Sequence, residues 1–380
     1  MRIAIINEPW NGGATRCARD LFNGLKARHE IWLCPEGTAP RSREVLPLLH
    51  AFNPDVVHLH AFYGWLGYQT LGQVARRYPT AFTPHDPRPI GQIEPACWQC
   101  GLNTTCFRCP LIAPGVKYTL VKHRYFSQRL KKRFVHGRTP RSLEVIGVSQ
   151  WFVERMRQQE MRRFRLRHLP NGIDTAVFRR VEDARRQLGL AENVDLILFL
   201  STPNVRWRVN ERKGMLPLAE AFIDHIAPRF PQAILAVAGD LLVPNHPRIR
   251  GLGYVAKDDL PLWYSAATTY VLPSLGDNLP YTVLEAMGCE CPVVATAVGG
   301  IPEQVEDGKT GILMPNNAPA TIASALAVIL EDRERAREMG KAGRRKVLAT
   351  YTMEQFVQRH EELYRSMLPG DRKIMALTAP

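Results

Sequence analysis

The chain has no long uninterrupted apolar run. No stretch approaches the roughly 18 apolar residues that a membrane-spanning helix requires, although 45% of the 380 residues are hydrophobic. The apolar run at residues 1–6 is shorter than the apolar region of a signal peptide, and it continues directly into Asn7 and Glu8. We therefore expect residues 3–7 to form a first strand and the protein to be cytoplasmic, without a transmembrane helix.

Acidic residues are also in short supply, and the chain contains no short tandem repeat or low-complexity tract. Asp and Glu number 36 against 50 Lys and Arg, which gives a formal net charge of +14. A surplus of this size favours polyanionic partners, such as nucleic acid, anionic lipid headgroups or phosphorylated ligands. Much of it lies between Arg124 and Arg180. A solvated helix face explains any one of these residues, but the cluster predicts an anionic surface nearby.

A disulfide framework is not expected, because the eight cysteines belong to a chain predicted to be cytosolic. Four of them form two Cys-x-x-Cys pairs separated by five residues. Four thiolates at this spacing suit a closed, tetrahedral structural zinc site, whereas an iron–sulfur cluster and unliganded thiols are the alternatives. The predicted zinc ligands are Cys97, Cys100, Cys106 and Cys109.

Short apolar runs alternate with amphipathic patterns along the chain. This alternation is typical of an α/β protein with doubly wound parallel sheets, and it occurs on both sides of Pro170-Asn171-Gly172. Because the Asn-Gly pair favours a turn, we predict two domains, residues 1–169 and 170–350, that are joined there by a hinge and face a cleft. Residues 351–380 are expected to contain a C-terminal helix that returns to the first domain. The predicted strands are residues 3–7, 30–34, 56–60, 80–83, 145–148, 196–201, 233–238, 269–272 and 292–296, and the predicted helices are residues 14–28, 65–78, 215–226, 281–287 and 353–367.

The most informative segment is residues 273–303. Asp277 follows a strand that looks buried, and Glu285 lies eight residues further on, inside the next predicted helix. The backbone N–H groups at the start of that helix are suited to bind an anion. A carboxylate on the loop can bind sugar hydroxyls, and a carboxylate inside the helix can bind a ribose diol. Alternatively, Asp277 is a helix N-cap and Glu285 a surface residue.

Taken together, these residues resemble the signature of family 4 of the glycosyltransferases, which have the GT-B fold of two Rossmann-like domains. The family has two acidic residues eight apart here, the first usually a Glu within Glu-Gly-Phe-Gly. This chain has Asp277 followed by Asn278-Leu279-Pro280 instead, a pattern that resembles a branch of bacterial polysaccharide and lipopolysaccharide enzymes. The resemblance implies that Asn278, Leu279, Pro280 and Glu285 bind the sugar donor and that Asp277 acts on the transferred sugar.

The resemblance extends over essentially the whole chain. In the family, an Arg and a Lys five residues apart bind the donor diphosphate, and Arg208 and Lys213 have this spacing, with Arg206 as the rival to Arg208. Two cations at this place stabilise the charge that develops on the leaving phosphates. The alternative is a basic surface loop.

In the first domain, Gly12-Gly13 resembles the glycine pair whose amides approach the β-phosphate, although two glycines also suit a plain turn. His60 resembles a histidine that lines the cleft on the acceptor side, with His58 on the same face of the strand. His85 resembles the histidine that contacts the transferred sugar, and we predict it as a catalytic residue rather than a structural one. The expected zinc loop lies on this acceptor side.

The sequence therefore predicts a retaining, hexosyltransferase-type glycosyltransferase (EC 2.4) that needs no catalytic metal. Its co-substrate is a nucleotide-diphosphate sugar, and its acceptor is a hydroxyl of a saccharide or lipid-linked molecule in cell-surface polysaccharide or glycoconjugate synthesis. The basic surface predicts peripheral contact with the anionic inner face of the cell membrane. The alternatives are a glycosyltransferase of small natural products, an inactive relative, and a basic zinc-knuckle protein that binds nucleic acid.

Overall fold

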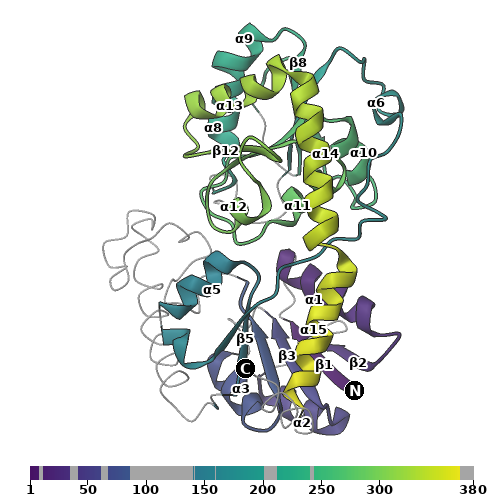
Figure 1. Ribbon diagram of the computed structural model, residues 1–380, viewed down its shortest axis with the longest axis vertical. Helices are drawn as coiled ribbons and strands as arrows, with labels where there is room; N and C mark the ends of the chain where they lie inside the picture. Colours follow the sequence, from purple (N-terminus) through teal and green to yellow (C-terminus); the bar gives the residue numbers. More distant parts are fainter. Residues whose placement is uncertain are drawn as a thin grey trace. The chain divides into compact units, whose positions relative to one another are not determined.

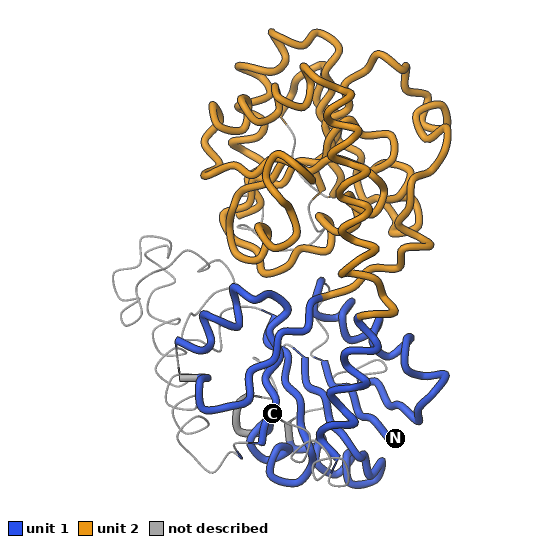
Figure 2. The backbone as a smooth tube through the Cα atoms, in the orientation of Figure 1, with its two compact units in different colours: residues 1–170, 356–380 blue, residues 171–355 orange. Residues whose placement is uncertain are grey.

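The computed structural model describes residues 1–7, 12–34, 42–60, 67–85, 140, 142–158, 160–200, 212–239 and 244–368. Arg206, Arg208 and the four predicted zinc ligands (Cys97, Cys100, Cys106 and Cys109) lie outside these residues. The chain divides into two compact units, shown in Figures 1 and 2: unit 1 is Met1–Pro170 with Phe356–Pro380, and unit 2 is Asn171–Gln355. No helix within the described residues has the length and apolarity needed to cross a membrane.

Unit 1 is built on a six-stranded sheet with the order β2-β1-β3-β4-β5-β6. All neighbouring strands are parallel, so their carboxyl ends lie at one edge. Every residue of β3 and β4 is buried, as expected where helices cover both faces of a parallel sheet. The strands are β1 (Arg2–Asn7), β2 (Glu30–Cys34), β3 (Val56–His60), β4 (Thr80–Thr83), β5 (Glu144–Gly147) and β6 (Arg165–His168).

The last helix of the chain, α15 (Met353–Met367), lies against the first in unit 1 (Figure 1). A Cβ on Gly24 would lie 2.3 Å from the Cγ2 atom of Val357, so a glycine is required where the two helices meet. The buried residues of α15 recur at helical spacing, which gives it one face that packs on unit 1. The other helices are α1 (Gly13–Leu25), α2 (Ser42–Phe52), α3 (Gly67–Ala75), α5 (Gln150–Arg157) and the 3-10 turn Glu160–Arg163.

Unit 2 repeats the architecture with a parallel six-stranded sheet of order β12-β11-β10-β7-β8-β9. Open parallel sheets bind ligands beyond the carboxyl ends of their strands, which for β10 is the segment that begins at Pro273. The strands are β7 (Asp195–Leu200), β8 (Ala233–Ala238), β9 (Ile249–Gly253), β10 (Thr269–Leu272), β11 (Val293–Thr296) and β12 (Gly311–Met314). The helices are α6 (Ala184–Gln187), α8 (Met215–Ala221), the π-helix Phe222–Ile226, α9 (Ala227–Arg229), α10 (Leu260–Ala266), α11 (Tyr281–Gly288), α12 (Ile301–Gln304), α13 (Pro319–Glu331) and α14 (Arg333–Thr350).

Candidate functional site

The loop that follows β10 in unit 2 is held from two sides, and this fixes the backbone of Asp277. On one side, Gly300 donates its N–H to the Asp277 carbonyl at 3.3 Å. Gly299 has a left-handed φ of 59°, and a Cβ there would lie 1.7 Å from the same carbonyl oxygen. The Thr296 hydroxyl donates to the Ser274 carbonyl. The glycine pair after β11 therefore serves to bring its loop against Asp277.

On the other side, residues 212–214, which precede α8, pack against the loop that follows β10. Leu275 donates its N–H to the Arg212 carbonyl at 2.7 Å, and the Ser274 hydroxyl donates to that carbonyl at 3.1 Å. Gly214 has a φ of 81°, and a Cβ there would lie 2.1 Å from the Pro273 carbonyl oxygen. Only glycine therefore permits this approach, which brings the side chains of Arg212 and Lys213 to Asp277.

Lys213 and Asp277 form a close ion pair. The Lys213 Nζ atom lies 2.8 and 3.0 Å from the two carboxylate oxygens, and each side chain is 12% exposed. Burial by itself would raise the pKa of the Asp277 carboxyl, but the charges of Lys213 and Arg212 lower it below its usual value. Burial lowers the pKa of Lys213, and Asp277 opposes that effect.

Arg212 belongs to the same cluster, although the sequence pattern did not single it out. Its Nη1 atom donates to the Gly276 carbonyl at 2.6 Å and lies 3.4 Å from an Asp277 carboxylate oxygen. The only signal for it in the sequence is its position beside Lys213. Arg212 and Lys213 thus place two adjacent cations beside Asp277.

The helix α11 starts directly after this loop with an open first turn. Its N-cap is Pro280, and no described residue provides a side-chain cap. The carbonyls just before it are already bonded, since Asn171 Nδ2 donates to Leu279 O at 3.3 Å and Gln304 Nε2 to Pro280 O at 3.0 Å. Asn278 and Leu279, which precede the helix, are buried. The first-turn N–H groups of α11 are therefore suited to receive an anion.

Glu285 lies inside α11 and is only 1% exposed. The Tyr264 hydroxyl donates to its carboxylate at 3.0 Å. Burial, followed by the charge of Glu285, raises the pKa of Tyr264 well above its usual value. The two alternative interpretations of these carboxylates are therefore wrong. Glu285 is not a surface residue, and the N-cap of α11 is Pro280, three residues after Asp277.

In unit 1, the ends of β3 and β4 bring His60 and His85 together. His60 Nδ1 lies 3.1 Å from His85 Nε2, and the Sγ atom of Cys17 lies within 4.8 Å of ligand atoms of both rings. Burial, then the charge of His360, lowers the pKa of His85 to about 3. Both imidazoles are therefore neutral near pH 7, since burial also lowers the pKa of His60 well below 6.5.

His58, on the same face of β3, is held by hydrogen bonds to both of its ring nitrogens. Its ring nitrogens lie 2.5 Å from the Tyr364 hydroxyl and 2.7 Å from the Thr83 hydroxyl. Both nitrogens are thus occupied. By contrast, His60 Nε2 has no hydrogen-bond partner among the described residues.

The Gly12-Gly13 pair begins α1. Gly12 is the N-cap, with a φ of 139° that favours glycine, and no side chain of the described residues caps the helix. A Cβ on Gly12 would meet no described atom within 4 Å. The first turn of α1 is therefore open to an anion in the same way as that of α11.

Two family models match this chain. The model described as Glycosyltransferase Family 4 matches residues 35–177, and the model described as Glycosyl transferases group 1 matches residues 195–332. Together they cover most of the sequence.

The chain belongs to family 4 of the glycosyltransferases.

Among curated family proteins, the chain is similar to the alpha-maltose-1-phosphate synthase of Mycolicibacterium smegmatis, at 33% identity over 52% of this chain and 56% of that protein. The chain spans about half the length of the curated relatives it matches.

Solved structures match over nearly the whole length. Sucrose-phosphate synthase from Thermosynechococcus elongatus matches with a TM-score of 0.74 at 21% identity, over 97% of this chain and 99% of that one. Anabaena HepE in complex with UDP-glucose matches with a TM-score of 0.72 at 18% identity, over 96% and 100%. The predicted fold, two Rossmann-like units of the GT-B class, is confirmed.

Proposed function

We propose that this protein is a retaining glycosyltransferase that takes its sugar from a nucleoside-diphosphate donor bound to unit 2. The observation that carries the proposal is the position of Lys213 and Arg212 beside Asp277, just ahead of the open first turn of α11. Two cations and a helix N-terminus together suit a diphosphate. The UDP-glucose bound by the HepE structure is a ligand of this class.

In this proposal the donor contacts are divided among three parts of unit 2. Lys213, with Arg208, binds the diphosphate, and Arg212 holds the loop. The segment Asn278, Leu279 and Pro280 presents the first turn of α11. Glu285 binds the ribose diol, with Tyr264 orienting its carboxylate.

Asp277 and the neutral His85 are proposed to contact the transferred sugar, and Gly12 and Gly13 to present amides to the donor phosphate. A neutral imidazole hydrogen-bonds a sugar hydroxyl without adding a positive charge. His60, whose Nε2 has no partner among the described residues, is proposed to line the acceptor side.

During transfer, the bond between the sugar's anomeric carbon and the β-phosphate oxygen breaks, and a new bond forms to the acceptor hydroxyl oxygen on the same face. The electron pair of the broken bond remains with the leaving phosphate, which takes the acceptor's proton. Lys213 stabilises the developing negative charge without a catalytic metal ion.

The proposed acceptor is a saccharide or lipid-linked hydroxyl in cell-surface polysaccharide or glycoconjugate synthesis. The basic residues between Arg124 and Arg180 support peripheral contact with an anionic membrane. The proposed structural zinc on Cys97, Cys100, Cys106 and Cys109 lies outside the described residues, and metal analysis of protein purified without chelators tests it: one zinc per chain is expected, and none would refute it.

A panel of nucleotide sugars tests the proposed activity. We expect one donor to release its nucleoside diphosphate, by hydrolysis or by transfer to an added saccharide, and proton NMR of the product to show the donor's anomeric configuration. Inverted product would refute retention. Turnover of no donor would refute the proposed activity.

A further inference from the structure

A charged cavity lies in unit 2, at the opposite end of the sheet from the candidate donor site. Its volume is about 300 Å³, at the lower end of the range for small-molecule sites. Thr268, which directly precedes β10, and Pro292, which directly precedes β11, are part of its lining. The pocket is therefore at the amino ends of these parallel strands, whereas Asp277 follows the carboxyl end of β10.

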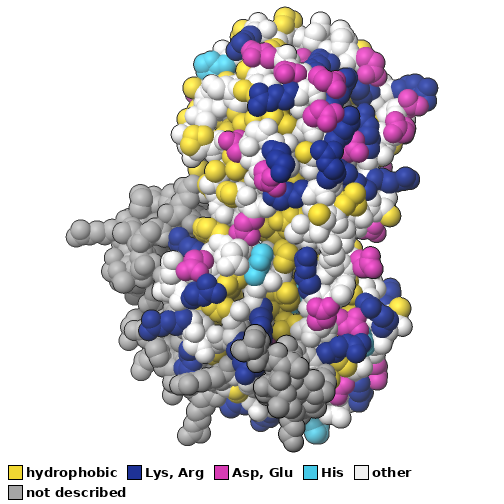
Figure 3. Space-filling view, viewed as in Figure 1, with side chains coloured by type: hydrophobic (Ala, Val, Ile, Leu, Met, Phe, Trp, Pro, Cys, Tyr) yellow, Lys and Arg dark blue, Asp and Glu magenta, His cyan; other side chains and the backbone are white. Residues whose placement is uncertain are grey.

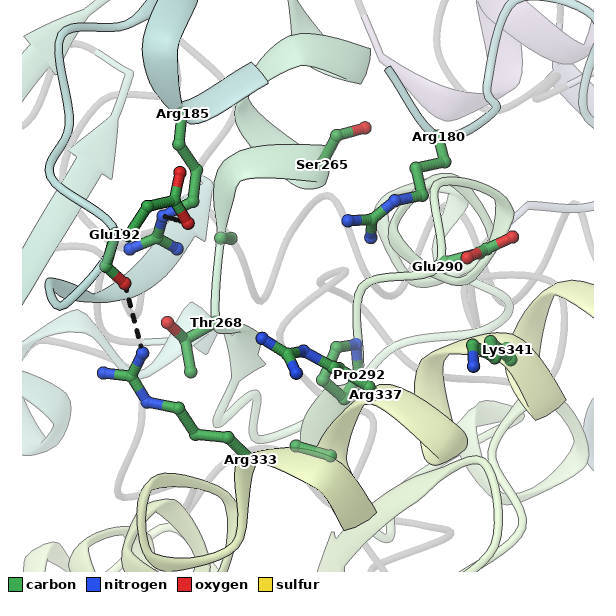
Figure 4. Close-up of a pocket in the computed structure, with 12 residues that line it drawn as sticks. Arg180, Arg185, Glu192, Ser265, Thr268, Glu290, Pro292, Arg333, Arg337 and Lys341 are labelled. Carbon is green, nitrogen blue, oxygen red and sulfur yellow. Dashed lines mark hydrogen bonds and ion pairs between the residues drawn. The ribbon is translucent and has the colours of Figure 1, made fainter. Parts of the chain in front are cut away.

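The lining of this amino-edge pocket is strongly basic (Figure 4). Two carboxylates, Glu192 and Glu290, accompany the cations in the lining, and Asp195, outside the lining, pairs with Arg333 at 2.6 Å. Positive charge remains in excess after these three are counted. The five cations are Arg180, Arg185, Arg333, Arg337 and Lys341.

Three of the cations share one face of α14. Arg333, Arg337 and Lys341 follow one another at intervals of four residues, so their side chains lie above each other on the helix. Like charges at this spacing destabilise a helix, and Arg333, in the first turn of α14, opposes the helix dipole. An anion in the pocket would offset both costs. On the face shown in Figure 3, Lys and Arg side chains gather over α14, with acidic side chains among them.

Two guanidinium groups of the pocket are held in place by backbone carbonyls. Arg185 donates to Ala266 O at 2.8 Å, and Arg333 donates to Asn193 O at 3.0 Å. The pKa of Arg185 is lowered by burial first and also by the charges of Arg333 and Arg337, while Glu192 opposes these effects. Arg185 and Arg333 are also paired with Glu192 and Asp195, at 3.8 and 2.6 Å. The two guanidinium groups are thus held in fixed positions, which suits them to receive an anionic ligand.

The remaining three cations of the lining are Arg180, Arg337 and Lys341. Arg180 forms no hydrogen bond or ion pair within the described part of the chain. Arg337 and Lys341 pair with Glu334 and Glu338 of their own helix at 3.4 and 2.7 Å. These pairs are solvent-exposed, and such pairs contribute little, so a ligand can replace them at low cost.

We propose that the amino-edge pocket binds a small soluble anion that carries at least two phosphate groups. Arginine forks match phosphate oxygens in pairs, and the cations come from two sides, with Arg180 and Arg185 facing the row on α14. The site is separate from the proposed donor site, and its binding test requires no glycosyl transfer.

Calorimetric titration with inorganic pyrophosphate tests the proposal. The titrations use the full chain carrying Lys213→Ala, so that the proposed donor site does not contribute. We expect one equivalent to bind at low salt, with at least tenfold weaker affinity in the pocket variant Arg337→Ala/Lys341→Ala. The control Arg335→Ala/Arg345→Ala removes the same charge from exposed positions of α14 outside the pocket lining and should bind as tightly as the parent.

Equal affinity in the two double variants, or no binding by the parent, would overturn the proposal. Sedimentation with vesicles of phosphatidylcholine and phosphatidylglycerol distinguishes a lipid headgroup from a soluble ligand. We expect both double variants to sediment equally. A loss confined to the pocket variant, with no pyrophosphate binding by the parent, would assign the pocket to a membrane and refute the soluble ligand.

Discussion

The ammonium group of Lys213 lies 2.8 Å from a carboxylate oxygen of Asp277, 64 residues later in the chain. The cation proposed to bind the donor diphosphate and the carboxylate proposed to contact the transferred sugar are thus direct partners. A donor bound as we propose would share or replace this ion pair. The pair also contributes to the stability of the loop, so its two roles have to be separated by experiment.

Lys213→Ala should lower transfer at least 100-fold, which corresponds to about 2.7 kcal/mol of transition-state stabilisation. It should also lower the free energy of unfolding by about 1–3 kcal/mol, because a largely buried carboxylate loses its closest partner while Arg212 remains. The double variant Lys213→Ala/Asp277→Ala should recover stability but not activity. Urea unfolding of the two variants checks this, and a double variant as unstable as the single one would refute the pairing.

Gly299→Ala should displace the loop that carries Asp277. The added Cβ would lie 1.7 Å from the Asp277 carbonyl oxygen in addition to the strain of a φ of 59°. Gly308→Ala is the matched control, with a φ of 72° and no described atom within 4 Å of the added Cβ. Gly308→Ala should lower the unfolding free energy by about 1 kcal/mol, from backbone strain alone. Gly299→Ala should lower it by at least twice that amount and should also abolish glycosyl transfer. Thermal unfolding and activity assays on both proteins measure the difference, and similar values would contradict the docking described for this loop.

Glu285→Gln should weaken nucleoside-diphosphate binding at least tenfold, since a neutral amide replaces the carboxylate proposed to bind the ribose diol. Tyr264→Phe removes the hydroxyl that donates to this carboxylate, and it should cost about 1–3 kcal/mol of unfolding free energy. Binding is measured by calorimetry and unfolding by urea titration. Unchanged nucleotide affinity in Glu285→Gln would exclude the ribose role.

Unit 1 should lose stability in mild acid. Burial lowers the pKa of His85 to about 3 and that of His360 to about 4, from 6.5. Above pH 6.5 both histidines are neutral in the folded and in the unfolded state, so they do not change the unfolding free energy. Below pH 6.5 the unfolded chain binds protons at these histidines that the folded chain does not bind, which lowers the unfolding free energy. Each buried histidine then lowers the unfolding free energy by up to about 1.4 kcal/mol per pH unit until its folded pKa is reached.

Hydrogen exchange in β3 and β4 at pH 7.5, 6.0 and 5.0, corrected for the intrinsic exchange rate, measures this effect. In the wild type, protection should decrease as the pH is lowered from 7.5 to 5.0. In His360→Asn, the decrease should be smaller. Protection that is constant or rises toward pH 5.0 would show that these imidazoles are not neutral in the fold.

The sheet architecture was predictable because its strands are apolar and short. The predictions for β2, β3, β4, β8 and β10 match the observed bounds, since each apolar run ends at a polar residue or a turn. The edge strands β6 (Arg165–His168) and β9 (Ile249–Gly253) were missed, because their largely unburied residues carry little apolar signal. The edge strand β12 (Gly311–Met314) was also missed, although it is apolar, because it is only four residues long. The predicted helix 215–226 is α8 continued by a π-helix at Phe222–Ile226, a change of hydrogen bonding that periodicity does not reveal.

The candidate site was predictable only where its residues lie close together in the sequence. Asp277 and Glu285 lie on one loop and helix, so their spacing was informative. The contacts of Arg212 and Lys213 with Asp277 bridge more than 60 residues, and they depend on the left-handed Gly214 at Pro273. The contact of His58 with Tyr364, which comes from the far end of the chain, could not be read from the local sequence.

Calorimetric binding of UDP, GDP, ADP and TDP to three proteins tests the central claim most directly. The wild type is compared with Lys213→Met and with Lys309→Met, which removes an exposed lysine of the same unit. We predict that one of the four nucleotides binds the wild type and Lys309→Met with the same affinity and binds Lys213→Met at least tenfold more weakly. Binding of none of the four, or equal binding by all three proteins, would contradict a donor site at Lys213 and α11.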